Sequence, residues 1–241
     1  MERMLRLGTI IALALVSAAR AATLVDFSFV GSAGNSNNVA PAAVNPALTV
    51  ASTGYIKRGA GMGADPGVPD IWSGDGFAAV NGPLSADTIA NAITRNVYAT
   101  FAFTVNSGYT VSLSTLIFGL CRQNPQTRNF TVLASLDGGV TGFTTDKVVG
   151  TATVTTDANP PTTATTIDLS GDARLQNIPA GTTVILRIYH HGTSSQWEGN
   201  AFSSKTPAGY PALPGLDLIG TASVVLGEQP VCTITDRKSV V

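Results

Sequence analysis

The side chains best placed to do chemistry are acidic residues that stand beside tryptophans. Glu198 follows Trp197 directly, and Asp70 and Asp75 flank Trp72. An acid next to an aromatic ring suits a sugar-active site, and glycoside hydrolysis normally uses two carboxylates across a cleft. The sequence shows no pattern that would place two of these acids across a cleft. The alternative interpretation of each acid is a solvated carboxylate in a loop. Hydrolysis of a sugar is therefore not the expected activity.

Nucleophilic and metal chemistry have weaker support. The chain has no Gly-x-Ser-x-Gly motif and only two histidines to act as a base. His190 and His191 are adjacent on an expected strand, where neighbouring side chains face opposite sides, so they cannot easily share one zinc ion. Asp65, Asp70 and Asp75 are spaced five residues apart, which matches no EF-hand loop.

The glycines of 59–64 (GAGMGA) superficially resemble a dinucleotide-binding turn. That motif requires a strand before it and a helix after it, and neither is indicated here. We therefore expect no nucleotide cofactor.

Binding of a sugar, without turnover, is a more specific hypothesis. Aromatic rings stack on the apolar faces of sugars, while polar side chains bind the hydroxyls. Trp72 and Trp197 lie in loop-like stretches rich in polar partners; the alternative is that both cap the edge of the core. The candidate glycan-binding residues are Trp72, Asp75, Tyr189, His190, Trp197 and Glu198.

Composition favours an exported β-protein and argues against a nucleic-acid partner. The chain has 14 basic and 15 acidic residues, and only 12% of its residues are charged. Such a surface has no electrostatic footprint for nucleic acid or anionic lipid. Abundant Thr, Ser, Gly, Ala and Asn suit the solvent faces of extracellular strands.

Both ends of the chain are expected to lie outside the folded domain. Residues 1–21 are typical of a signal peptide, with an apolar run over 7–19 and cleavage after Ala21; a buried N-terminal helix is the alternative. Residues 236–241 (DRKSVV) resemble a translated sequencing-adapter read, and the alternative is an ordinary polar tail. We expect one β-sandwich domain over 22–228, with a linker and tail over 229–241.

Strands are indicated by repeated alternation of apolar and polar residues. A hairpin is expected where 101–105 and 109–113 flank the turn Asn106-Ser107-Gly108. The other expected strands are 25–29, 130–136, 148–155, 165–169, 184–189 and 218–226. Many short strands with almost no helix predict a sandwich or barrel.

Three other features qualify this picture. Residues 85–93 are the one stretch that hints at a helix, and 48–82 is expected to be a long loop region. Cys121 and Cys232 could form a disulfide in an exported protein, while unpaired thiols are the alternative.

Several short stretches, taken in order, resemble exported bacterial β-sandwich proteins of the PEP-CTERM sorting class. They are 23–29 (TLVDFSF), 58–62 (RGAGM), 98–105 (YATFAFTV), 108–113 (GYTVSL), 135–138 (SLDG), 167–171 (IDLSG) and 187–189 (RIY). The resemblance implies surface or matrix sorting by a C-terminal Pro-Glu-Pro segment, an apolar helix and an Arg-rich end. Residues 227–230 (GEQP) stand where a linker to such a signal would begin, but depart from Pro-Glu-Pro.

The last expected strand carries a second resemblance. Residues 216–220 (LDLIG) are similar to the final strand of galactose-binding-like jelly rolls, in which an acidic residue helps to hold a structural calcium ion. The resemblance implies an antiparallel jelly-roll-like sandwich, with Asp217 as a calcium ligand. No other cofactor is expected.

Together these features predict an exported, non-enzymatic protein of the cell surface or extracellular matrix. Polysaccharide or matrix is the expected partner, and membrane anchoring is expected only through a C-terminal segment beyond this sequence. A carbohydrate-binding module and an accessory domain of a secreted polysaccharide-active enzyme are the alternatives.

Overall fold

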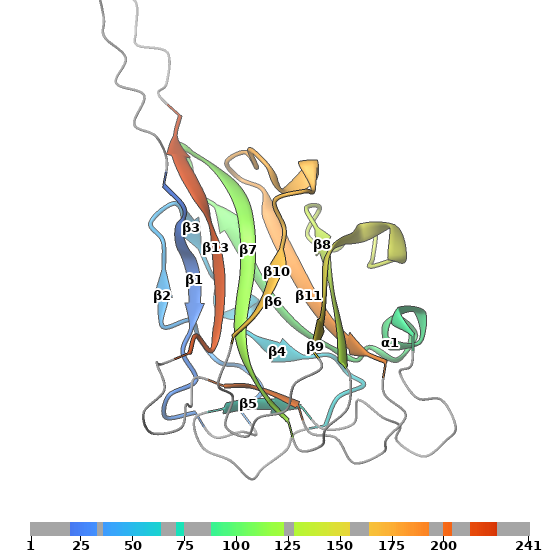
Figure 1. The fold of residues 1–241 in the computed structure, drawn as a ribbon. Helices are drawn as coiled ribbons and strands as arrows, with labels where there is room; N and C mark the ends of the chain where they lie inside the picture. The colour runs from blue at the N-terminus through green and yellow to red at the C-terminus, as the bar shows by residue number, and fades with distance from the viewer. Residues whose placement is uncertain are drawn as a thin grey trace, which may run out of the picture.

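In the computed structural model of the chain, two antiparallel β-sheets pack face to face (Figure 1). The structure describes residues 20–32, 36–63, 71–74, 88–122, 128–154, 164–192, 200–203 and 213–225. The expectation of an all-β antiparallel sandwich is confirmed by this arrangement. Residues 1–19 and 226–241, which include most of the expected signal peptide and the tail, lie outside the described residues.

The first sheet has the order β2-β1-β13-β7-β12-β5, and β10 also pairs with β7. Its strands are β1 (Ala22–Phe27), β2 (Ala43–Val44), β5 (Ile71–Gly74), β7 (Tyr109–Arg122), β10 (Ala164–Asp168), β12 (Asn200–Ser203) and β13 (Leu216–Val224). The long strand β7 organises this sheet, because three other strands pair with it.

The second sheet has the order β3-β6-β11-β8-β9, with β4 also paired to β6. Its strands are β3 (Leu48–Thr49), β4 (Lys57–Arg58), β6 (Tyr98–Val105), β8 (Arg128–Ser135), β9 (Val148–Val154) and β11 (Thr183–His191). Strand β11 lies in the middle and pairs with β6 on one side and β8 on the other.

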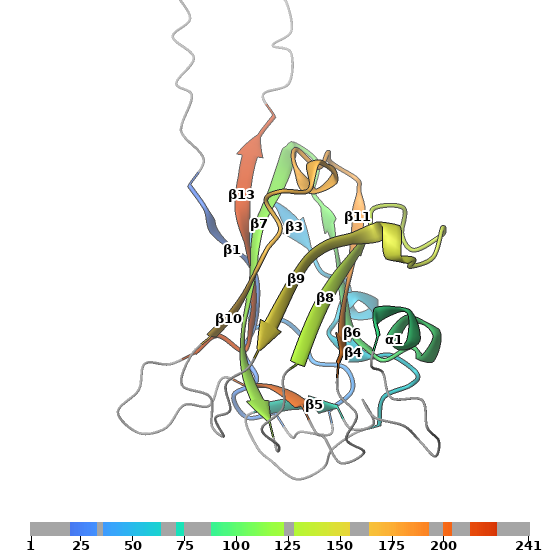
Figure 2. The ribbon, with the colours of Figure 1, turned by 45° about the vertical axis from the view of Figure 1, so that its right-hand side comes forward.

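Helical structure in the described residues is short and lies outside the two layers. The α-helix α1 (Ile89–Arg95) overlaps the stretch where a helix was expected, and Figure 2 shows it beside the outer face of the second sheet. Thr88 caps its start by accepting a hydrogen bond from the Asn91 backbone N–H at 3.2 Å. The 3₁₀ turns are η1 (Ser52–Gly54), η2 (Thr145–Lys147) and η3 (Ala173–Leu175).

The core lies between the sheets and is built from the alternating apolar residues. On β6, Phe101, Phe103 and Val105 are each only 1% exposed. The ring of Phe27 on β1 meets Phe101 edge-on with centroids 5.2 Å apart, so the contact joins the two sheets. Burying a side chain of this size contributes roughly 2 to 3 kcal/mol, which makes such pairs a main source of stability.

The hairpin expected around Asn106 is wrong. β6 belongs to the second sheet and β7 to the first, so the turn carries the chain across the sandwich. Asn106 holds this crossing, because its Nδ2 donates to the Pro46 carbonyl at 2.8 Å and its Oδ1 accepts from Thr49 Oγ1 at 2.7 Å. Strands that pair and strands that pack face to face show the same alternation, so the pattern could not separate the two arrangements.

The long loop expected over 48–82 is only partly correct, because β3, η1, β4 and β5 lie within it. The glycine-rich stretch has a structural role at the C-terminal end of α1. The Gly59 N–H donates to the Tyr98 carbonyl at 2.7 Å, and the Gly61 N–H donates to the Asn96 carbonyl at 3.1 Å. A Cβ on Gly61 would lie 1.9 Å from the Arg95 carbonyl oxygen, so the close approach requires glycine there.

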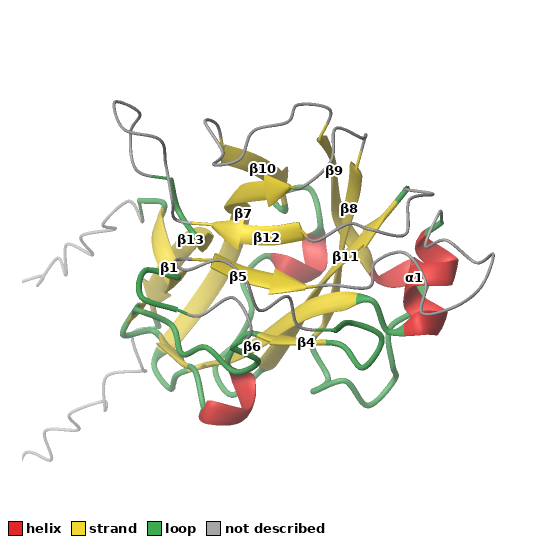
Figure 3. Ribbon diagram, turned by 90° about the horizontal axis from the view of Figure 1, so that it is seen from below, coloured by secondary structure: helices red, strands yellow, loops and turns green. Residues whose placement is uncertain are grey.

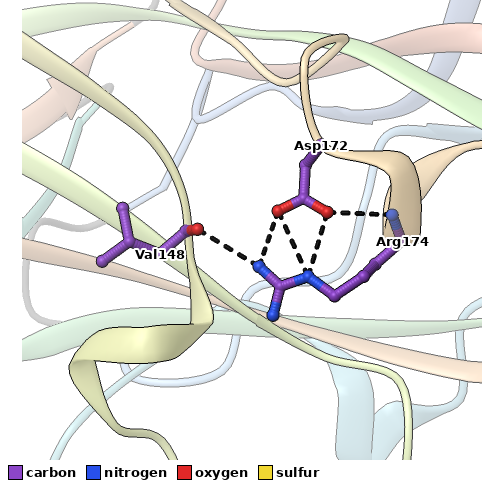
Figure 4. A network of polar contacts seen from close by, with 3 residues as sticks. All are labelled: Val148, Asp172 and Arg174. Carbon is purple, nitrogen blue, oxygen red and sulfur yellow. Dashed lines mark hydrogen bonds and ion pairs between the residues drawn. The ribbon is translucent and has the colours of Figure 1, made fainter.

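One edge of the sandwich is closed by a polar contact between its two layers (Figure 4). Asp172, just after β10, accepts hydrogen bonds from Arg174 Nε at 2.9 Å and Nη2 at 2.6 Å. The same Nη2 donates to the carbonyl of Val148, the first residue of β9, at 3.2 Å. The edge strand of the second sheet is thereby tied to the turn that follows β10 of the first.

The two ends of the sandwich differ in what they carry. Strand β1 begins and β13 ends at the same end, because these neighbours are antiparallel, with Ala22 opposite Gly220. We call this end the terminal pole; Figures 1 and 2 show both strands there. At the opposite end, the distal pole, β5 and β12 lie side by side across the sandwich (Figure 3).

None of the helices in the described part of the chain has the length and apolar character of a membrane span.

Candidate functional site

Trp72 lies in the core, in strand β5, and not in a loop as expected. Its side chain is 2% exposed and stacks on Phe202 of β12, with ring centroids 5.6 Å apart. The Arg58 guanidinium carbon lies 4.8 Å from the centre of the indole ring. With only 2% of the side chain exposed, the ring is not open to a sugar in this structure.

Tyr189 and His190 are consecutive on β11 and therefore point to opposite faces of the second sheet. His190 is 1% exposed and faces the core, where its ring lies 5.2 Å from that of Phe130. Tyr189 faces the outer side and is buried against Tyr98, with centroids 5.3 Å apart. The structure does not bring the two together, and Asp75, Trp197 and Glu198 lie outside the described residues.

The outer face of the second sheet holds a group of charged and aromatic side chains that we call the arginine clamp: Tyr98, Phe143, Arg187 and Tyr189. The guanidinium carbon of Arg187 lies 4.1 Å from the ring centre of Tyr98 and 3.9 Å from that of Phe143. Two rings thus hold one cation, each by a cation–π contact. Arg187 Nη1 also donates a long hydrogen bond to Tyr189 Oη at 3.4 Å.

Strand register and a tight loop position the members of the clamp. Tyr98 on β6 is directly opposite Tyr189 on β11, so their side chains lie on the same face. Ala92 of α1 packs in the same small apolar cluster as Tyr189 and Phe143. Burial raises the pKa of Tyr189, which keeps its phenol protonated.

Phe143 reaches the clamp from the loop after β8, which Asp137 organises. Asp137 accepts backbone hydrogen bonds from Gly139 at 3.0 Å and Thr141 at 3.1 Å, and further bonds from the Ser135 and Thr141 hydroxyls. These donors, above all the Ser135 and Thr141 hydroxyls, hold the pKa of Asp137 well below its usual range. The loop is therefore tied at its start and folds back over the sheet.

Further along the same face lies a polar row made of Asn129, Thr131, Thr153 and His191. Thr131 Oγ1 and His191 Nε2 are 2.9 Å apart, and Thr153 Oγ1 donates to Asn129 Oδ1 at 2.8 Å. Burial lowers the pKa of His191, so its imidazole is neutral at physiological pH. Thr131 is only 4% exposed, so Asn129, Thr153 and His191 are the members of the row whose polar groups could reach a sugar hydroxyl.

Asp217 faces a second carboxylate, Asp26, across the β1–β13 pair. Burial, with the negative charge of Asp26, raises the pKa of Asp217 to about 6. Its Oδ1 is buried without a hydrogen-bond partner. The pair lies on the outer face of the first sheet, because Val25, Phe27, Leu216 and Leu218 on either side of the two acids face the core.

A calcium ion at Asp217 would need more ligands than this pair supplies. Calcium takes six to eight oxygen ligands, and in the described residues no three His, Cys, Asp or Glu side chains gather around one point. Backbone carbonyl oxygens also serve as calcium ligands, so a calcium ion at Asp217 stays a prediction.

Sequence reasoning missed Arg187, Tyr98 and Phe143. One signal was present: Arg187 is a charged residue inside the apolar stretch 184–189 (VILRIY), on the same side of the strand as Tyr189. The contribution of Phe143 had no such signal, because it comes from a loop that folds back onto the sheet.

No protein-family model matches the sequence, and no curated protein matches it. Among solved structures, the chain is similar to the crystal structure of a Stig cyclase, Fisc, from Fischerella sp. TAU in complex with (3Z)-3-(1-methyl-2-pyrrolidinylidene)-3H-indole. The identity is 9% and the TM-score 0.32, over 83% of this chain and 98% of that chain. A likeness at that TM-score carries no argument about this protein.

Proposed function

We propose that this chain is an exported, non-enzymatic β-sandwich domain, jelly-roll-like in its organisation, that acts at the cell surface or in the extracellular matrix. The observation that carries the proposal is that β1 begins and β13 ends at the same pole of the sandwich. The described chain enters through β1 and leaves through β13 at the terminal pole. A domain tethered at one pole presents the opposite pole and both sheet faces to its surroundings.

The residues on the solvent faces support the same role. On β7 the alternating positions Thr110, Ser112 and Ser114 carry small hydroxyl side chains, and Thr221 and Ser223 do so on the neighbouring β13. Small hydroxyls on a low-charge surface suit a durable extracellular sandwich. The signal-like residues 1–21 add the route of export.

Export is tested by expressing the full chain in a bacterium with a general secretion pathway. We expect the mature protein to begin at Ala22, as read by N-terminal mass spectrometry, and to leave the cytoplasm. A variant with Leu13→Arg, which interrupts the apolar run, is expected to stay unprocessed inside the cell. Equal processing of both chains, or retention of the unmodified chain in the cytoplasm, contradicts export.

Location and context are tested in the native host. Antiserum against the purified domain should label intact cells or their matrix, whereas labelling only after permeabilisation contradicts a surface role. Sequencing the native gene past codon 235 distinguishes the alternatives. A Pro-Glu-Pro segment, apolar helix and terminal arginines support surface sorting; a further domain with paired carboxylates makes this sandwich an accessory module of a secreted enzyme.

A further inference from the structure

We propose that the arginine clamp is a binding site for a carboxylate-bearing sugar, in which Arg187 binds the carboxylate. The proposal rests on the surface or matrix role proposed above and names the ligand class, an acidic polysaccharide containing uronic acid.

The guanidinium of Arg187 is held in place by aromatic rings but makes few hydrogen bonds. Its central carbon lies 4.1 Å from the ring centre of Tyr98 and 3.9 Å from that of Phe143, so two aromatic contacts hold it in place. Of its five N–H groups, one makes a long hydrogen bond of 3.4 Å to Tyr189, and Nε is buried with no hydrogen-bond partner. The buried, unpaired Nε–H costs free energy, and an anion beside the guanidinium would stabilise its charge.

No carboxylate in the described part of the chain fills that role, because each has a different partner. Asp26 faces Asp217, Asp137 accepts from Ser135 and Thr141, Asp146 from Thr144, Asp168 from Ser170, and Asp172 from Arg174. Arg174 shows the contrast, because it is the arginine with a described ion pair, at 2.6 Å. None of the described carboxylates is therefore the partner of Arg187.

The geometry favours a carboxylate on a sugar. A planar guanidinium binds a carboxylate through two parallel hydrogen bonds, and it is pre-organised here by the two rings. Tyr98 and Arg187 are both only partly buried, so the clamp is accessible to solvent. The accessible members of the polar row, Asn129, Thr153 and His191, continue along the same face. His191 lies about 13 Å from Arg187 along β11, at roughly 3.3 Å per residue. A ligand with one carboxylate and many hydroxyls matches this sequence of groups.

The test measures binding of the mature full chain to polygalacturonate by isothermal titration calorimetry. The comparison probes are fully methyl-esterified polygalacturonate, dextran and polyglutamate. We expect polygalacturonate to bind, the ester and dextran not to bind, and polyglutamate to bind at least tenfold more weakly. If the methyl ester binds as tightly as polygalacturonate, the carboxylate is not what the site recognises. If polyglutamate binds as tightly, the sugar is not recognised. No binding of polygalacturonate overturns the proposal.

The variants are Arg187→Met and the control Arg174→Met, which removes the arginine that pairs with Asp172 where β9 meets the turn after β10. We expect Arg187→Met to weaken binding at least tenfold, the loss expected when a charge-assisted pair is removed, while Arg174→Met binds as the unmodified protein does. Equal affinity of Arg187→Met overturns the site.

If Arg187→Met does not fold, the site can still be tested on the unmodified protein by NMR. The NMR signal of the Arg187 Nε–Hε group should shift on addition of polygalacturonate and return towards its free position as salt is raised. An unmoved signal at saturating polymer overturns the proposal. If polygalacturonate does not bind but the antiserum labels intact cells, only the proposed ligand is rejected. If the antiserum does not label intact cells or their matrix, the surface role itself is rejected.

Discussion

Single residues in this sandwich have environments that their sequence neighbours do not reveal. Asp217 is the clearest case, because antiparallel pairing places a second carboxylate, Asp26, directly opposite it. Like charges opposite one another on a sheet destabilise the fold, and partial burial adds to that cost. Folding therefore favours the protonated form of Asp217, and the pKa of this carboxyl is raised to about 6.

This shift predicts a pH-dependent stability. Because the pKa is raised in the folded state to about 6, the contribution of Asp217 is fully present below the ordinary aspartate value of about 4 and is lost as pH rises through about 6. A full shift of that size corresponds to about 3 kcal/mol. Solvent screening of the half-exposed carboxyl reduces it to about 1 kcal/mol.

We expect Asp217→Asn to unfold with about 1 kcal/mol more free energy than the unmodified protein at pH 7, and with no such gain at pH 4. Urea unfolding between pH 4 and 7 measures the difference. Asp168→Asn is the control, because Asp168 is exposed and its pKa is lowered by hydrogen bonds from Ser170. An equal gain at both pH values for Asp217→Asn contradicts the explanation.

At the scale of elements, the position of a strand was easier to predict than its partner. The alternation over 101–105 and 109–113 correctly marked two strands, but the two strands belong to opposite sheets. Helix α1 is only seven residues long and too short to be stable alone, so its packing must hold it. Part of that packing is the turn Gly59–Gly61 against its C-terminal end.

The glycine turn makes a direct prediction. A Cβ at Gly61 would lie 1.9 Å from the Arg95 carbonyl oxygen, so Gly61→Ala must push the turn and helix end apart. We expect a loss of about 2 kcal/mol in unfolding free energy, within the range for overpacking. Gly171→Ala is the matched control, because its Cβ would meet nothing within 4 Å. A comparable loss in both variants would show that steric contact is not the cause.

At the scale of the whole molecule, stability depends on keeping two sheets together at their edges. Gly150 on β9 approaches β10 so closely that a Cβ there would lie 2.7 Å from the Asp168 carbonyl oxygen. The contact of Asp172, Arg174 and Val148 closes the same edge (Figure 4). The edge strands thereby shield one another, and free strand edges are a route to aggregation.

Arg174→Met is expected to loosen this edge. The Arg174 guanidinium holds the pKa of Asp172 below its usual range, so the pair stabilises the fold above pH 4 and loses its effect as pH falls through the lowered value. Because the Arg174 side chain is 42% exposed, we expect a loss of only about 0.5 kcal/mol at pH 7. Hydrogen exchange should quicken in β9 and β10 and not in β1. If hydrogen exchange instead quickens equally in all three strands, the loss is not confined to this edge of the sandwich.

The sequence by itself determined local features: strands at 130–136, 148–155 and 184–189, their inward faces, and a short helix at 85–93 that overlaps the observed Ile89–Arg95. These follow from side-chain periodicity and turn residues, which act over a few residues. The tertiary structure alone decided which strands share a sheet, that Trp72 is buried, that Asp26 meets Asp217, and that Phe143 closes over Arg187. Those contacts join residues far apart in the chain, and long-range packing leaves no periodic trace in the sequence.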